Sequence, residues 1–332
     1  MNPFGYTRAG SVEDAVTAAR QPGAMYLGGG TNLIDLTKYD VLHPDLMVDV
    51  THLPNDEVTE IGEGALKGGV RIGAAMRNSD TANHALIRRR YPLLSQALLS
   101  GASAQLRNMA TMGGNLLQRT RCYYFMDTAF ERCNKRSPGS GCAAREGYNR
   151  LHAIFGASEA CIATNPSDMN VALAALDAVI VVQSARGERR IPIAEFHRLP
   201  GDTTHIETEL AEGELITAVE LPPQGYARNS HYLKIRDRAS YAFALVSAAV
   251  GLQMDAGTVQ QSRIALGGVA HKPWRLPQVE AMLTGQRLTP ELLATAGDAA
   301  ARDAQPYAHN AFKVELTRRA VVRSLEIAGG LA

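Results

Sequence analysis

The chain has 332 residues, of which 45% are hydrophobic and 20% are charged, and its formal net charge is +1. This balance is ordinary for a globular protein, and it indicates neither nucleic acid nor a membrane surface as the main partner. No apolar run reaches the about 18 residues that a membrane-spanning helix needs, and no signal peptide is expected. The length predicts two or three domains.

The first half of the chain predicts short strands that alternate with helices and glycine-rich turns. A short strand leads into a helix capped by Ser11, and the apolar segment 24–27 predicts the next strand, directly before the glycine-rich segment 28–33. The further elements expected here are strands at 46–50 and 69–75, a mostly helical region at 78–103 that breaks at Pro92, and a second glycine-rich turn at 110–117.

The second half continues this alternation, which indicates an α+β or α/β class. The elements expected here are a helix at 169–176, strands at 178–184 and 214–222 with a hairpin turn after the first, strand-like segments at 231–237, 243–254 and 263–270, and helices over about 278–330. The Pro222-Pro223-Gln224-Gly225 segment predicts a boundary between one domain at 1–223 and another at 226–332.

The two glycine-rich segments suit a phosphate-binding site. In both, glycines would let backbone N–H groups approach an anion, and the first precedes a possible helix. The first is not a Rossmann fingerprint, because Leu33 stands where the third glycine belongs and because a strand and a helix precede it. Two turns that clamp a pyrophosphate from two sides are one interpretation, and two unrelated glycine turns are the other.

All four cysteines lie close together in the sequence, with the spacing Cys-x10-Cys-x8-Cys-x18-Cys; they are Cys122, Cys133, Cys142 and Cys161. Two disulfides would need an oxidising compartment. Structural zinc sites usually contain Cys-x2-4-Cys pairs, which are lacking here. Four thiolates also hold iron–sulfur clusters, and Lys135, Arg136 and Arg119 suit an anionic cluster. The spacing alone leaves all three interpretations open.

Five segments taken in order resemble one known family: 25–36, 98–117, 163–173, 213–222 and 234–249. They follow the order found in the FAD-binding medium subunits of molybdenum hydroxylases, the xanthine dehydrogenase family, and the resemblance covers essentially the whole chain. It implies an α+β fold: an FAD-binding domain of the vanillyl-alcohol-oxidase or PCMH type with two α/β subdomains, then a C-terminal α+β domain of the CO dehydrogenase flavoprotein type.

One departure from the family pattern carries the cysteines, because the segment from about 117 to 161 looks like an insertion. A similar insert binds a [4Fe-4S] cluster in the medium subunits of 4-hydroxybenzoyl-CoA reductase and of bacterial periplasmic aldehyde oxidoreductases. The sequence of this chain is more similar to the aldehyde oxidoreductase subunits. The resemblance therefore implies a [4Fe-4S] cluster with Cys122, Cys133, Cys142 and Cys161 as its ligands.

The resemblance also implies residues that bind FAD. Asp168 would contact the adenosine side, Lys234 would lie near the flavin, and Phe243 would line the isoalloxazine ring. Considered alone, Asp168 is a helix N-terminal residue, Lys234 a solvated strand-end residue and Phe243 a core residue. The full set is Tyr26, Leu27, Gly28, Gly29, Gly30, Thr31, Asn32, Leu33, Gly101, Thr111, Gly113, Gly114, Asn115, Asp168, Ile216, Lys234 and Phe243.

The function implied by the resemblance is electron transfer in a heterotrimeric, molybdenum-dependent aldehyde oxidoreductase. A large partner subunit would hold the molybdenum cofactor and a small one two [2Fe-2S] clusters. Electrons would reach the FAD of this chain and leave to a small-molecule or protein acceptor. No catalytic residue is expected on this chain. Alternatives are a stand-alone flavin reductase or oxidase of the same superfamily, and a non-redox assembly subunit with a zinc loop. The expected location is the periplasm, by export with a partner, or else the cytoplasm.

Overall fold

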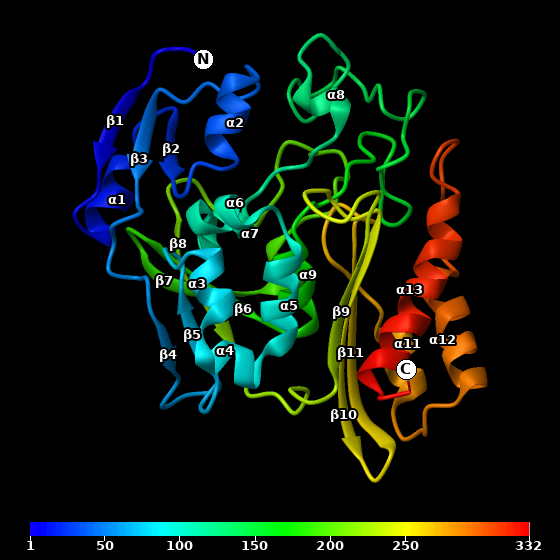
Figure 1. The fold of residues 1–332 in the computed structure, drawn as a ribbon. Helices are drawn as coiled ribbons and strands as arrows, with labels where there is room; N and C mark the ends of the chain where they lie inside the picture. The colour runs from blue at the N-terminus through cyan, green and yellow to red at the C-terminus, as the bar shows by residue number, and fades with distance from the viewer. Residues whose placement is uncertain (332) are drawn as a thin grey trace.

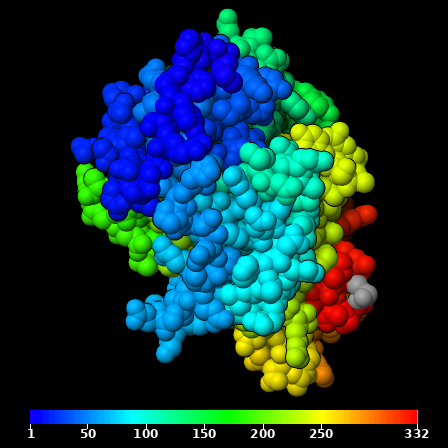
Figure 2. Space-filling model, turned by 60° about the vertical axis from the view of Figure 1, so that its left-hand side comes forward, coloured from blue at the N-terminus to red at the C-terminus, as the bar shows by residue number. Residues whose placement is uncertain are grey.

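The computed structural model of the protein describes residues 1–331, which form three β-sheets with α-helices between and around them (Figure 1). Two sheets belong to the N-terminal part of the chain and the third to the C-terminal part. On the surface, the N-terminal subdomain, the helical layer around residues 75–110 and the C-terminal unit lie next to one another (Figure 2). The mixture of helices and sheets confirms the predicted α+β class.

The N-terminal subdomain contains three parallel strands in the order β1-β3-β2. Its elements are β1 (Gly5–Arg8), α1 (Val12–Ala18), β2 (Ala24–Leu27), α2 (Leu33–Lys38) and β3 (Leu46–Asp49). Ser11 caps α1 as predicted, because its hydroxyl oxygen accepts the N–H of Asp14 at 3.0 Å. Val48 on the sheet and Ala15 on α1 are fully buried together. This packing fixes β2, which leads directly into the first glycine-rich segment.

The second sheet has five antiparallel strands in the order β4-β5-β8-β6-β7. Its strands are β4 (Val58–Glu60), β5 (Val70–Gly73), β6 (Val179–Ser184), β7 (Gly187–Pro192) and β8 (Leu215–Leu221). The helices that follow these strands in the chain are α3 (Asn78–Asn83), α4 (Ala85–Arg90), α5 (Pro92–Ser100), α6 (Ala104–Met109), α7 (Met112–Leu116), α8 (Tyr123–Met126), α9 (Asp168–Ala175) and α10 (Ile193–Phe196). Pro92 begins α5, where its missing N–H is not needed.

The C-terminal unit has an antiparallel sheet in the order β12-β11-β10-β9. Its elements are β9 (Ser230–Ile235), β10 (Val246–Asp255), β11 (Thr258–Gly267), β12 (Trp274–Arg275), α11 (Pro277–Leu283), α12 (Pro290–Ala301) and α13 (Phe312–Ala328). Helix α13 packs on one side of this sheet, while α5 and α9 pack on the other (Figure 1). Because both faces are covered, the first seven residues of β10 are all buried, which explains the continuous apolar run in the sequence.

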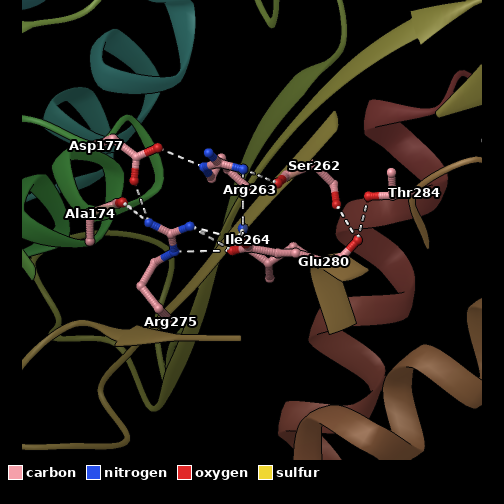
Figure 3. A network of polar contacts seen from close by, with 8 residues as sticks. All are labelled: Ala174, Asp177, Ser262, Arg263, Ile264, Arg275, Glu280 and Thr284. Carbon is pink, nitrogen blue, oxygen red and sulfur yellow. Dashed lines mark hydrogen bonds and ion pairs between the residues drawn. The ribbon is translucent and has the colours of Figure 1, made fainter. Parts of the chain in front are cut away.

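A network of ion pairs connects the N-terminal part to the C-terminal sheet (Figure 3). Asp177 follows α9, and its two carboxylate oxygens each accept one arginine at 2.6 Å, Arg263 of β11 and Arg275 of β12. Arg275 also donates to Glu280 of α11 at 2.9 Å. Asp177 belongs to the N-terminal part and pairs with two strands of the C-terminal sheet. These ion pairs therefore hold the two parts of the chain together across the boundary that the sequence predicts.

The cysteine-containing insert, residues 117–161, is mostly irregular, with α8 as its helix. The side chain of Asn134 organises it: Oδ1 accepts the N–H groups of Gly139 and Gly141 at 3.0 and 2.9 Å, and Nδ2 donates to the carbonyl of Ala160 at 2.9 Å. Both glycines have φ near +90°, where a side chain would strain the backbone. Bonds between side chain and backbone therefore replace regular structure here.

No helix within residues 1–331 is both long enough and apolar enough to cross a bilayer.

Candidate cofactor site

The first glycine-rich segment connects β2 to α2 and leaves its backbone donors free. Within the described residues, the N–H groups of Gly29 to Asn32 donate to no backbone carbonyl, so consecutive donors are open to an anion. A Cβ on Gly29 would lie 1.9 Å from the carbonyl oxygen of Met109. Gly30 has a φ of +73°, a conformation that glycine adopts without strain. Both positions therefore require glycine.

The second glycine-rich segment is the short helix α7, so the predicted turn is wrong. Thr111 caps this helix, since its Oγ1 accepts the N–H of Gly114 at 3.1 Å, and the N–H of Gly113 donates to the carbonyl of Ala74 at 2.9 Å. These donors are taken by the protein. A Cβ on Gly113 would lie 3.3 Å from the Cβ of Ala74, so glycine here allows the helix to approach the sheet. The first segment therefore has free backbone N–H donors, whereas the glycine of the second segment allows close packing of α7 on the sheet.

Residues of both segments line one pocket, which has about 510 Å³ of empty space and is partly open to solvent. The first segment contributes Gly28 alone, and Gly29 to Asn32 follow it outside the lining. Six of the predicted residues line it: Tyr26, Gly28, Thr111, Gly113, Gly114 and Ile216. Asn55 and Glu214 also line it, and the sequence analysis missed both. Glu214 lies in a segment that carried the resemblance, which was a usable signal, whereas nothing in the sequence marks Asn55. The Oδ1 atom of Asn55 is buried and has no partner among the described residues.

Two polar groups set the electrostatics of this pocket. The hydroxyl of Tyr26 donates to the carbonyl of Gly213 at 2.9 Å, and burial raises the pKa of Tyr26 well above its ordinary value. Arg189 donates to both carboxylate oxygens of Glu214 at 2.6 Å, and these bonds lower the pKa of Glu214. The pocket therefore presents a neutral phenol and an ionised carboxylate, and the carboxylate is an acceptor suited to hydroxyl groups.

Asn32 connects the first glycine-rich segment to the insert. Its Oδ1 accepts the N–H of Arg119 at 3.1 Å, while its Nδ2 is buried without a partner among the described residues. The predicted residues around it occupy the end of β2, the turn and the start of α2; they are Leu27, Thr31 and Leu33.

Gly101, Asp168 and Lys234 lie together in a separate cluster between α5, α9 and β9. Lys234 Nζ donates to Asp168 Oδ2 at 2.7 Å and to the carbonyl of Ser100 at 3.1 Å, and the hydroxyl of Tyr232 donates to Asp168 Oδ1 at 2.7 Å. The Lys234 side chain is only 4% exposed, so it is not a solvated strand-end lysine. A Cβ on Gly101 would lie 3.3 Å from Asp168 Oδ2. The two predicted contacts of FAD therefore contact each other here.

Phe243 and Asn115 complete the predicted set. Asn115 accepts the Ser167 hydroxyl at 2.8 Å, and this bond connects α7 to the first residue before Asp168. Phe243 is 44% exposed, with the guanidinium of Arg121 over its ring at 5.6 Å. It lies neither in the hydrophobic core nor on the wall of the glycine-lined pocket.

The four cysteines line one cavity in the insert, which has about 290 Å³ of empty space and is partly open. None of the four forms a disulfide, and Cys122 Sγ lies 3.1 Å from His152 Nε2. Burial raises the pKa of Cys122 to about 12 and that of Cys161 to about 11. Within residues 1–331, no three His, Cys, Asp or Glu side chains are placed to hold a single metal ion. The thiols surround a hollow rather than a point, and their role as metal ligands stays a prediction.

A third hollow, of about 310 Å³, lies between the glycine-lined pocket and the insert. Leu117 lines both this hollow and the glycine-lined pocket. Glu207 also lines the third hollow and accepts Lys135 Nζ at 2.9 Å, and Lys135 in turn lines the cysteine cavity. Two buried histidines, His197 and His271, line it as well. The glycine-lined pocket and the cysteine cavity are thus separated by one layer, which consists of the third hollow and the side chains that line it.

Two family profiles match the chain. The FAD binding domain in molybdopterin dehydrogenase matches residues 2–224, and the CO dehydrogenase flavoprotein C-terminal domain matches residues 231–328. The chain therefore belongs to the FAD-binding subunits of the molybdenum hydroxylase, or xanthine dehydrogenase, family, and it is a subunit of an oxidoreductase.

Individual relatives agree with this assignment. The chain is 50% identical to the aldehyde oxidoreductase FAD-binding subunit PaoB of Escherichia coli (strain K12), over 98% of each chain. It is 29% identical to the glyceraldehyde dehydrogenase medium chain of Sulfolobus acidocaldarius, over 87% of this chain and 84% of that one. The solved carbon monoxide dehydrogenase of Hydrogenophaga pseudoflava superposes with a TM-score of 0.76 and 26% identity, over 100% of both chains.

The glycine-lined pocket fits the FAD of this family. The unpartnered Asn55 Oδ1 in the pocket, and the free N–H groups of Gly29 to Asn32 directly after the lining residue Gly28, are features that a hydroxyl-rich, phosphate-containing cofactor would satisfy. When bound, FAD supplies the electron-transfer chemistry, while the protein binds and orients it. The contacts of the individual residues with FAD remain predictions.

Proposed function

We propose that this chain carries FAD and a [4Fe-4S] cluster as the electron-transfer subunit of a heterotrimeric, molybdenum-dependent aldehyde oxidoreductase. The observation that carries this proposal is that four free thiols line a single cavity in a chain of the FAD-binding subunit family. Four thiolates are the usual ligands of a [4Fe-4S] cluster. Because burial opposes ionisation of Cys122 and Cys161, bound iron would supply the positive charge that the thiolates need.

The layer between the two sites supports electron exchange within the chain. Leu117 separates the FAD pocket from the third hollow, and the pair of Glu207 and Lys135 separates that hollow from the cysteine cavity. A cluster in the cavity would therefore be separated from the glycine-lined pocket by this hollow and the side chains on either side of it.

The proposed partners perform the substrate chemistry. A large subunit would hold the molybdenum cofactor and oxidise the aldehyde, and a small subunit with two [2Fe-2S] clusters would pass the electrons on. The names of the relatives, aldehyde oxidoreductase and glyceraldehyde dehydrogenase, support an aldehyde as the substrate. This chain would then need no catalytic acid or base, and its tasks are to hold the flavin and admit a small-molecule or protein acceptor.

We place the complex in the periplasm, exported together with a partner that carries the signal. Fractionation of cells that express all three subunits tests this. Recovery of this chain with the periplasmic proteins is expected, and its retention in the cytoplasm would favour the alternative location.

Anaerobic reduction of the purified complex by an aldehyde tests the proposed function. We expect the flavin absorbance to bleach in the complete complex and to stay unchanged when this chain is mixed with aldehyde alone. Bleaching of the isolated chain would instead indicate a stand-alone flavoenzyme. A complex that oxidises aldehyde while this chain contains zinc and no flavin would indicate the assembly subunit.

A further inference from the structure

The cysteine cavity contains a buried positive charge with no thiol partner of its own. Lys135 lies two residues after Cys133, lines the same cavity as the four cysteines, and its side chain is only 1% exposed. Buried lysines are rare unless they are paired.

The ammonium group is fixed by two acceptors that belong to residues outside the lining of the cysteine cavity. Lys135 Nζ donates to Glu207 Oε1 at 2.9 Å and to the carbonyl of Thr204 at 3.0 Å. Arg119 donates to the same carboxylate oxygen, at 2.8 Å from one of its terminal nitrogens. Although burial opposes ionisation of Glu207, these two cations lower its pKa to about 2, so the carboxylate stays charged near neutral pH.

Three other cations of the insert are placed differently. Arg119 pairs with Glu207 as Lys135 does, but it does not line the cavity. Arg136 donates to the backbone carbonyls of Phe125 and Asp127 at 2.9 and 3.2 Å, and so braces the loop. Arg132 does line the cavity, but its side chain is 56% exposed and paired with Glu146 at 2.9 Å. Among these four cations, Lys135 alone is both buried and next to the thiols.

We propose that Lys135 is a positioning residue that sets the reduction potential of the cluster held by the four cysteines. This inference rests on the proposed function, because it requires an iron–sulfur cluster in the cavity. Reduction adds one negative charge to a group that the thiolates already make negative. A fixed ammonium inside the protein stabilises that extra charge more than it would in water, and so raises the potential.

Redox titration of the complete complex, followed by the electron paramagnetic resonance signal of the reduced cluster, tests this. The variant Lys135→Gln keeps amide donors for Glu207 and Thr204 but loses the charge. At a fixed ambient potential we expect its ratio of reduced to oxidised cluster to fall about tenfold, which equals about 59 mV for a one-electron couple. Lys135→Arg, which keeps the charge, should remain close to the wild type.

Arg132→Gln is the matched control, since it removes a cavity-lining charge that solvent already screens. Its potential should stay within a small fraction of the Lys135→Gln shift. An unchanged potential in Lys135→Gln, or an equal shift in Arg132→Gln, would overturn the inference. Loss of iron from Lys135→Gln beside a loaded wild type would also overturn it, in favour of a purely structural lysine. A wild-type complex without iron in this chain would instead overturn the proposed function, and the inference with it.

Discussion

The glycine-lined pocket and the cysteine cavity are built in opposite ways within one chain. The pocket is formed by backbone that regular elements position: Gly28 follows β2, and Gly113 belongs to α7, which packs on the second sheet. The cavity lies in mostly irregular backbone that Asn134 and Arg136 hold through bonds to carbonyls and N–H groups. The first site is therefore preformed by regular elements, whereas the second depends on bonds made by side chains.

The largest effect is expected from a substitution that disrupts FAD binding and leaves the cysteine cavity intact. In Gly29→Ala the new Cβ would meet the carbonyl oxygen of Met109, which Arg77 holds in place with a bond of 2.5 Å. We expect FAD affinity to fall by at least about tenfold, measured as flavin per chain after gel filtration, with the iron content unchanged. Gly62→Ala is the control, because a Cβ there meets nothing within 4 Å, and it should retain its flavin. Full flavin in Gly29→Ala would show that the pocket does not depend on this contact.

The reciprocal change breaks the cavity alone. Cys133→Ser removes one of the four thiols, and we expect a loss of roughly four iron per chain, measured by iron analysis, with FAD retained. If FAD is lost together with the iron, the two sites are not independent and the comparison fails. Full iron content in this variant would exclude Cys133 as a ligand.

Acid should weaken the layer between the two sites. Burial lowers the pKa of both His197 and His271 to about 4, whereas unfolded histidine titrates near about 6.5. Between these two pKa values the unfolded chain binds more protons than the folded chain. The free energy of unfolding is therefore highest above about pH 6.5, and it decreases as the pH falls to about 4, by up to about 3 kcal/mol for each histidine. Denaturant unfolding at several pH values measures this slope.

The matched pair for this measurement is His271→Gln and His205→Gln. Gln at position 271 can still donate to the carbonyl of Arg198, which His271 contacts at 2.9 Å, but it does not titrate, so the slope should decrease. His205 is exposed, and its replacement should leave the slope unchanged. Equal slopes in all three proteins would contradict the assignment of acid sensitivity to this layer.

The smallest effect concerns the support of the irregular insert. Asn134→Ala removes three hydrogen bonds, each of which contributes about 1 kcal/mol. We expect faster hydrogen exchange confined to residues 133–142, and little change in the FAD pocket. Ser140→Ala removes only the bond from the N–H of Cys133, and its effect should be about a third as large. Faster exchange spread over the whole chain would mean that the insert supports the global fold.

Local signals in the sequence were sufficient for much of the fold. Ser11 caps α1 through its own side chain, and this cap can be predicted from the sequence. The continuous apolar run of β10 predicts a buried strand, although β10 starts at Val246 rather than at 243. The second glycine segment was predicted wrongly as a turn, because its helix depends on a tertiary partner: Gly113 donates to Ala74, which lies far away in the sequence.

The candidate sites show the same division. Grouping of the four cysteines and of the glycine segments follows from the sequence pattern and the resemblance, and the structure places each group around one hollow. The partners of buried charges do not follow from sequence, because Asp168 and Lys234, like Lys135 and Glu207, are about 70 residues apart and meet only in the fold. Asn55 likewise could not be predicted from the sequence, because only the folded structure places it on the wall of the glycine-lined pocket.

The most direct test of two cofactor sites in one chain is an anaerobic absorbance spectrum of the purified complex, with flavin, iron and zinc counted per copy of this chain. The account predicts one FAD, and about eight iron in the complex with both partners, of which roughly four are lost in Cys133→Ser. Zinc or disulfides at the four cysteines, with FAD present, would contradict the cluster and leave the flavin subunit. Absence of FAD would contradict the account as a whole.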